Sequence, residues 1–90
     1  MPFEWDPAKR RANLAKHGID FADAAKIFDG PTIEQVDDRM DYGEERILAL
    51  GETNGRIIAV IHTWRGEARR IISARKATRH EAAQYRALLP

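Results

Sequence analysis

The sequence predicts an α+β fold, with two N-terminal helices and one C-terminal helix packed on a twisted, mainly antiparallel sheet. Three observations predict it: helix caps and helical spacing in residues 6–28, strand alternation with tight turns in residues 32–74, and a capping box before the last apolar stripe. With a short first strand, the expected element order is β-α-α-β-β-β-β-α. This order favours helices on one face of the sheet, with the other face partly open.

The first strand and the first helix have clear local signals. Phe3-Glu4-Trp5 alternates apolar and polar residues, as a short strand does. Asp6 can cap a helix whose first residue, Pro7, loses nothing by lacking an N–H. The helix should run from Pro7 to about His17 and end at Gly18, which tolerates the left-handed conformation. Its expected buried side consists of Ala8, Ala12, Ala15 and Ile19.

A second, shorter helix is expected directly afterwards. Asp20 is a good cap for a helix from Phe21 to about Phe28, and Gly30-Pro31 ends it. Its apolar stripe consists of Phe21, Ala24, Ala25 and Phe28.

The middle of the chain changes to the two-residue period of strands. Residues 32–36 and 46–52 are predicted strands, and the polar residues 37–43 form a turn between them. The Asn-Gly pair within residues 53–55 is a strong hairpin signal.

An antiparallel meander is expected to follow. Residues 56–65 make the best strand of the chain, and they are apolar on both faces, which predicts a central position in the sheet. A turn at 65–68 leads to a strand at 69–74. Thr78 and Glu81 then form a capping box for a final helix with Ala82, Tyr85 and Leu89 on one stripe.

Length and composition limit the possible classes of protein. Ninety residues make one domain. A composition of 43% hydrophobic and 32% charged residues is typical of a globular protein. The chain has no cysteine, which excludes disulfide and thiolate chemistry and fits a cytoplasmic location. No signal peptide is evident, and the longest apolar run, Ile57 to Ile61, is far too short to span a membrane.

Positive charge is concentrated in the last third of the chain. Residues 56–86 contain eight Arg or Lys and two Glu, and the rest is acidic because the whole chain sums to only +1. Most of these cations are arginines, which bind phosphate with two parallel hydrogen bonds. This uneven distribution of positive charge predicts a polyanionic partner, RNA or DNA.

Several motifs along the chain resemble those of a known toxin family. They are F-x-W-D-P-x-K at 3–9, N-x-x-K-H-G-I-x-F-x-x-A at 13–24, R-M-D-Y-G-E-E-R at 39–46, N-G-R at 54–56, R-I-I-S-A-R-K-A at 70–77 and E-x-x-x-Y at 81–85. In this order they resemble the BrnT-type toxins of BrnT/BrnA type II toxin–antitoxin systems.

The resemblance implies a RelE-like fold and metal-independent endoribonuclease activity without a cofactor, which would arrest growth. It also implies neutralisation by a BrnA-type antitoxin with a ribbon-helix-helix DNA-binding part. Operator DNA would then be bound only through that antitoxin, in a toxin–antitoxin heterotetramer.

Metal-free RNA cleavage needs a base, an acid and fixed positive charge near the phosphate. The candidate catalytic residues are His62, Arg65, Arg75, Arg79 and Glu45. Candidate RNA-binding residues are Arg69, Arg70, Lys76, Lys16 and His17, and no metal ligands are expected, because the three histidines are widely spaced. Strand alternation sends His62 and Arg65 to opposite faces unless the strand twists or bulges, and lets at most one of Arg69 and Arg70 face the open side.

Structural roles compete with these functional ones. His62 could be a half-buried histidine bonded across the sheet, and Arg75 or Arg79 could pair with the acidic residues 37–45. Trp5 and Trp64 fit the core, a partner-binding surface or base stacking. The alternative function is a non-catalytic nucleic-acid-binding or protein-interaction module that uses the same basic face.

Overall fold

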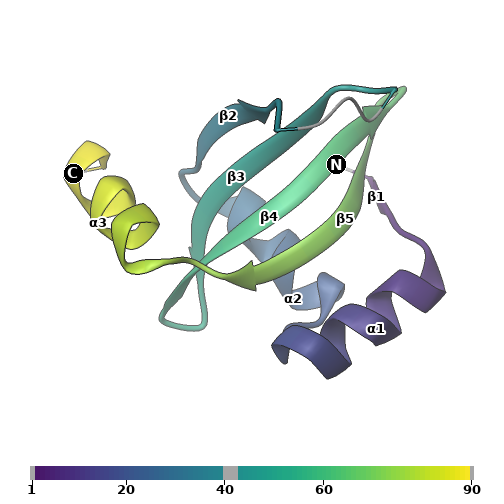
Figure 1. Ribbon diagram of the computed structural model, residues 1–90, viewed down its shortest axis with the longest axis horizontal. Helices are drawn as coiled ribbons and strands as arrows, with labels where there is room; N and C mark the ends of the chain where they lie inside the picture. Colours follow the sequence, from purple (N-terminus) through teal and green to yellow (C-terminus); the bar gives the residue numbers. More distant parts are fainter. Residues whose placement is uncertain (1, 40–42, 90) are drawn as a thin grey trace.

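A computed structural model describes residues 2–39 and 43–89, and its elements follow the predicted order (Figure 1). The predicted second helix is an α-helix of one turn, α2, that tightens into the 3₁₀ helix η1. The elements are β1 (Phe3–Glu4), α1 (Pro7–His17), α2 (Phe21–Ala24), η1 (Ala25–Asp29), β2 (Ile33–Asp37), β3 (Arg46–Thr53), β4 (Arg56–Arg65), β5 (Ala68–Lys76) and α3 (Arg79–Leu88).

The strands form one mixed sheet in the order β1-β5-β4-β3-β2, with β4 in the centre as predicted. The pairs β2–β3, β3–β4 and β4–β5 are antiparallel. Only β1 runs parallel to its neighbour, with Phe3 opposite Arg69 on β5. The outer edge of β2 ends the sheet on the other side.

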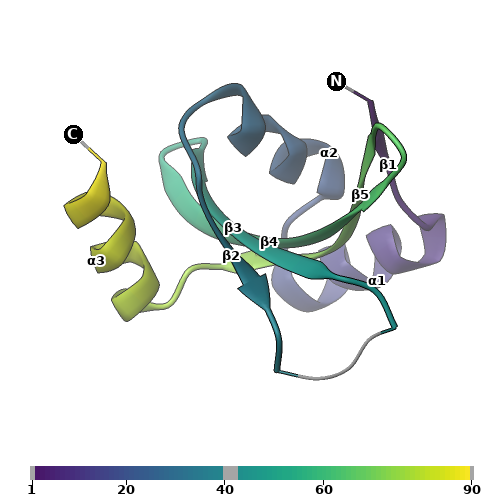
Figure 2. The same ribbon diagram turned by 90° about the horizontal axis from the view of Figure 1, so that it is seen from above.

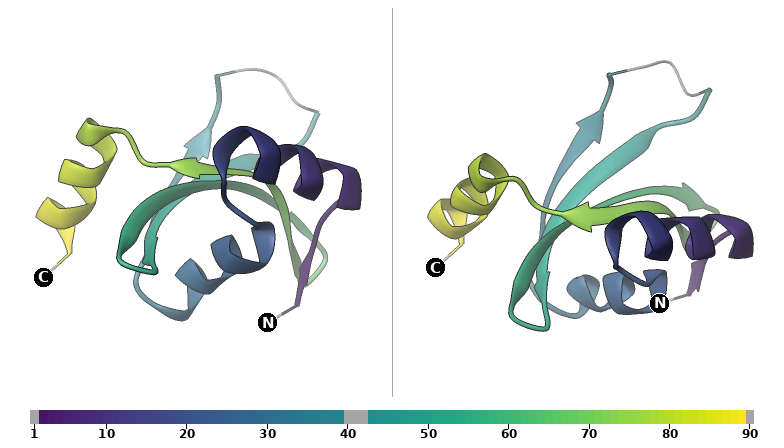
Figure 3. Two further views of the ribbon diagram at one scale, coloured as in Figure 1. Left: turned by 90° about the horizontal axis from the view of Figure 1, so that it is seen from below. Right: turned by 60° about the horizontal axis from the view of Figure 1, so that its bottom comes forward.

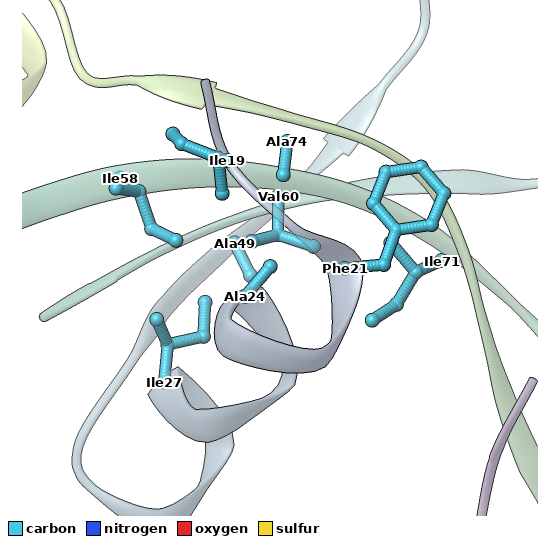
Figure 4. Close-up of a cluster of buried hydrophobic side chains, with 9 residues drawn as sticks. All are labelled: Ile19, Phe21, Ala24, Ile27, Ala49, Ile58, Val60, Ile71 and Ala74. Carbon is cyan, nitrogen blue, oxygen red and sulfur yellow. The ribbon is translucent and has the colours of Figure 1, made fainter. Parts of the chain in front are cut away.

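One face of the sheet, here called the helix face, carries the larger apolar cluster. The pairing of β3, β4 and β5 places Ala49, Val60 and Ala74 side by side. Phe21, Ala24 and Ile27 of α2 and η1 cover these three residues (Figure 4). Figure 2 shows α2 in the hollow of the curved sheet. Through this packing, α2 and η1 form one unit with the curved sheet.

The opposite face, here called the open face, carries a second cluster. Leu50, Ala59 and Ile61 alternate with the helix-face residues and pack with Tyr85 of α3. The three helices therefore do not share one face, contrary to the expectation, because α3 returns to the open face at the end of the sheet where β5 stops (Figure 1). Leu48, Ile57 and Ile72 belong to the same cluster, and polar and charged residues of β4 and β5 share this face.

Helix α1 packs along the edge of β5, and its contact is polar rather than apolar (Figure 3). Asn13 is 7% exposed; its Nδ2 donates to the carbonyls of Ala74 (2.8 Å) and Ile19 (3.0 Å), and its Oδ1 accepts from the Ala74 N–H (3.1 Å). The predicted buried alanines 8, 12 and 15 are exposed, so that expectation was wrong for all but Ile19. The reason is that β5 extends beyond β1, and its unpaired backbone groups need a polar partner.

The predicted caps and turn are confirmed. Asp6 accepts from the Ala8 N–H and Asp20 from the Ala22 N–H, while Thr78 and Glu81 close both bonds of the capping box. Asn54 and Gly55 have positive φ angles of 53° and 75°, as a tight hairpin turn requires. Among the helices described, none combines the length and apolar character needed to cross a membrane.

Candidate active site and nucleic-acid interface

The open face carries a row of arginines, each held by a carboxylate. The register places Arg65, Arg70 and Arg75 on this face, together with Thr63 and Ala59 of β4. Arg65 Nη2 lies 3.4 Å from Glu44, and Arg70 Nη1 lies 3.0 Å from Glu4; Arg75 forms the pair described next. We call Arg65, Arg70 and Arg75 the arginine row. Their fixed positions present several hydrogen-bond donors on one surface.

Arg75 is the most firmly positioned of the three. Its Nη1 and Nη2 donate to the two carboxylate oxygens of Glu81 at 2.7 and 3.0 Å, and the two side chains are only 30% and 17% exposed. The same carboxylate accepts from the Thr78 N–H, so one group orients the arginine and caps α3. Arg75 and the Thr78 N–H lower the pKa of Glu81 to about 2, which keeps it ionised. Only the capping role of Glu81 was predicted from the sequence.

A cleft of 560 Å³ between the β3–β4 turn and α3 is lined by cations. Lys76, Arg79, Arg56 and Arg86 are the cations among its described lining residues, which include no carboxylate. We call this the basic cleft. Arg56 and Arg86 were not among the residues predicted from the sequence. The spacing of Arg79, Ala82 and Arg86 does place these three residues on one side of a helix. The N-terminus of α3 borders the cleft and adds a favourable field for an anion.

A second groove, of 320 Å³, lies between α1 and β5. Lys9, Lys16 and His17 line it from α1, and Ile72 with Ser73 line it from β5. We call this the α1–β5 groove. It brings the predicted RNA-binding residues Lys16 and His17 beside the strand that carries Arg70 and Arg75.

His62 lies on the helix face and is fully buried. Its Nε2 is 3.3 Å from Glu34 Oε1, without the direction of a hydrogen bond, and Arg69 Nη1 donates to the same oxygen at 2.9 Å. Burial, and then the charge of Arg69, lower the pKa of His62 to about 4, against a smaller opposing effect of Glu34. The imidazole is therefore neutral at pH 7.

Aromatic rings enclose this buried group. The Arg69 guanidinium lies 3.8 Å from the centroid of the Phe28 ring and 4.5 Å from that of Trp64. His62 meets both rings edge to face. Trp64 is 43% exposed and covers the cluster from outside, whereas Arg69, expected to bind RNA, is buried.

The structure therefore divides the predicted catalytic residues between the two faces. Arg65 and Arg75 share the open face, Arg79 lies in the adjoining basic cleft, and His62 lies on the other side of the sheet. The register irregularity at Ile61/His62 does not bring His62 and Arg65 to one face. The partner of Arg75 on β4 is Ala59, six positions before Arg65. This corresponds to about 20 Å along the strand, so these two arginines do not meet at one phosphate.

Arg75 or Arg79 was expected to pair with the acidic residues 37–45. Arg75 forms its ion pair with Glu81, and Asp37 and Asp38 of that segment line the same cleft as Arg75. It is Arg65 that pairs with this segment, through Glu44. Glu45 is exposed at the start of β3, and its carbonyl accepts from the Thr63 hydroxyl at 2.7 Å. Residues 40–42 lie outside the described part of the chain.

Within residues 2–39 and 43–89, no group of three or more His, Asp or Glu side chains is placed to hold a metal ion. The positive charge of the open face comes from arginine and lysine side chains.

Comparison with known proteins places these features in a family. A family model described as the ribonuclease toxin BrnT of type II toxin–antitoxin systems matches residues 5–81. The crystal structure of the Brucella abortus ribonuclease toxin BrnT is similar, with 41% sequence identity and a TM-score of 0.66, over 88% of this chain and 99% of that chain. No curated protein matches the chain. The chain therefore belongs to the BrnT family of ribonuclease toxins of type II toxin–antitoxin systems.

Proposed function

We propose that this toxin is a metal-independent endoribonuclease whose substrate crosses the open face and enters the basic cleft. The observation that carries this assignment is the positioned Arg75, held by both oxygens of Glu81 in a separate cleft of 260 Å³ that β2 and β3 also line. An arginine whose orientation is set before the substrate arrives stabilises a transition state without a cost of reorganisation.

The reaction is an attack of a ribose 2′-hydroxyl on the adjacent phosphorus, with departure of the 5′-oxygen. The phosphorane that forms carries more negative charge than the ground-state phosphate, so fixed cations favour it selectively. Arg75 would stabilise the phosphorane in this way. A metal ion supplies the same stabilisation in other nucleases, and here the guanidinium groups would replace it.

The remaining cations bind the rest of the RNA. Lys76, Arg79, Arg56 and Arg86 line the basic cleft and would hold phosphates on one side of the cut. Arg65, about 20 Å from Arg75 along the strands, would contact a different phosphate. Because carboxylates already neutralise much of the arginine row, binding to RNA is expected to depend on local geometry more than on net charge.

The partner that neutralises the toxin would be a BrnA-type antitoxin with a ribbon-helix-helix part, in a heterotetramer that binds operator DNA through the antitoxin. Two surfaces offer room for it: the open face, and the outer edge of β2, which can accept an added strand. Covering the open face would block RNA directly. The toxin would act in the cytoplasm, where its substrate is found.

Cleavage of RNA by the purified toxin with EDTA present tests this function. The expected result is endonucleolytic fragments that are unchanged by EDTA and absent when purified antitoxin is added in excess. Folded protein that binds RNA but leaves it intact would indicate the non-catalytic alternative. Cleavage that EDTA abolishes and Mg²⁺ restores would refute metal independence.

A further inference from the structure

Only one of the chain's three histidines lines a groove along β5, the strand that carries Arg70 and Arg75. His17 lines the α1–β5 groove with Lys9 and Lys16. His62 is buried on the helix face, and His80 is exposed on α3 outside the lining of the basic cleft. An accessible imidazole, supplied by α1, therefore lies beside Ile72 and Ser73, which stand between Arg70 and Arg75 in the chain.

The position of His17 is determined by buried contacts of α1. Asn13, one turn earlier, holds the helix to Ala74 of β5 through two hydrogen bonds. Gly18, with φ of 71°, ends the helix directly after His17 and donates its N–H to the Leu14 carbonyl. These contacts set the last turn of α1 against β5 and leave the His17 side chain exposed.

A β-bulge in β5 lies at the same place. Ser73 pairs with Ile61 and Ile71 pairs with His62, so Ile72 is an extra residue opposite the central strand. Bulges of this kind redirect side chains, often beside active sites. Here Ile72 and Ser73 both line the groove, and Ser73 stands two residues, about 7 Å, from Arg75 along the strand.

The open face has many proton donors, and no carboxylate is among the described residues that line the α1–β5 groove. Lys and Arg side chains only donate. Glu4, Glu44 and Glu81 are acceptors, but each is bound to an arginine. Cleavage needs an acceptor for the proton of the 2′-hydroxyl, and imidazole is the side chain best suited to accept one near neutral pH.

We propose that His17 is the general base of RNA cleavage; this role rests on the proposed ribonuclease function. A nitrogen of His17 takes the proton of the 2′-hydroxyl while the O2′–P bond forms. The P–O5′ bond then breaks, and the 5′-oxygen takes a proton from water and leaves as a hydroxyl. The products are a 2′,3′-cyclic phosphate and a 5′-hydroxyl end, and the proton on His17 returns to water.

Chemical rescue of His17→Ala tests this assignment. Single-turnover cleavage of a short RNA would be measured for the wild type, His17→Ala and the matched control His80→Ala, with and without added imidazole. His17→Ala is expected to be about 10²- to 10⁴-fold slower. Imidazole should restore part of the rate, and His80→Ala should cleave like the wild type. Binding of the 2′-deoxy analogue, which lacks the nucleophile, should be unchanged in His17→Ala.

Three results would overturn the role of His17: an unchanged rate in His17→Ala, a loss of rate that imidazole does not restore, or a loss explained by weaker binding of the analogue. His17→Gln, which keeps a polar side chain but does not titrate, should also remove the limb of the pH–rate profile that falls towards low pH. Absence of cleavage by the wild-type protein would instead refute the ribonuclease function itself, and with it this role.

Discussion

Arg69 and Arg70 are adjacent in β5 and have opposite environments. Arg69 is buried between Phe28 and Trp64, and it donates to Glu34 above the buried His62. Arg70 faces the open side and pairs with Glu4. Strand alternation predicts that they separate, but the sequence does not show which one is covered, because the aromatic rings come from η1 and from the adjacent strand.

The stability of the fold should depend on pH through His62. Burial lowers its pKa from 6.5 to about 4, so between these values the unfolded chain binds a proton that the native state does not. Stability is therefore fully present above pH 6.5 and is lost as the pH falls towards 4, by about 2 kcal/mol at pH 5 from this group.

Urea unfolding at pH 7.5 and pH 5 measures this effect, with His62→Phe as the variant that cannot titrate. Phenylalanine suits a site bounded by Phe28 and Trp64. The wild type should lose more stability than His62→Phe between the two pH values. Equal losses would show that His62 does not titrate abnormally in the folded protein.

At the scale of elements, β3 and η1 are in contact where a glycine leaves no room for a side chain. A Cβ at Gly51 would lie 2.6 Å from Cβ of Ile27, which belongs to the core of the helix face. Gly51→Ala is expected to destabilise the fold by about 1–3 kcal/mol, because either β3 or η1 must move.

Gly30→Ala is the matched control, since a Cβ there meets nothing within 4 Å and its φ of −120° suits any residue. Thermal and urea unfolding of both variants should show a loss only for Gly51→Ala. Equal stability of the two variants would mean that η1 moves away from β3 at little cost.

Local signals predicted the elements well, whereas their packing depended on distant residues. Caps, the Asn-Gly turn and the central strand are properties of short segments, and the structure confirms them. The buried side of α1 could not be predicted from its alanines, because the exposed edge of β5 selects Asn13. The Arg75–Glu81 pair joins a strand to the helix after it, and only the capping part of that arrangement has a sequence signature.

At the scale of the whole molecule, the sheet separates two groups of polar residues that the sequence places close together. The helix face holds His62, Glu34 and Arg69 in a covered cluster that contributes to the fold. The open face holds the arginine row, and β5 also contributes residues to the basic cleft and the α1–β5 groove. We therefore propose that RNA cleavage belongs to the open face, and that the covered cluster on the helix face stabilises the sheet.

Single-turnover cleavage of one RNA by the wild type, Arg75→Gln and His62→Phe tests this division most directly. The two variants change opposite faces, and circular dichroism would confirm that each is folded. Arg75→Gln is expected to lose about 10²- to 10³-fold in rate, while His62→Phe should cleave nearly as fast as the wild type. Loss of cleavage in folded His62→Phe with a normal rate in Arg75→Gln would contradict this expectation and move the active site to the helix face.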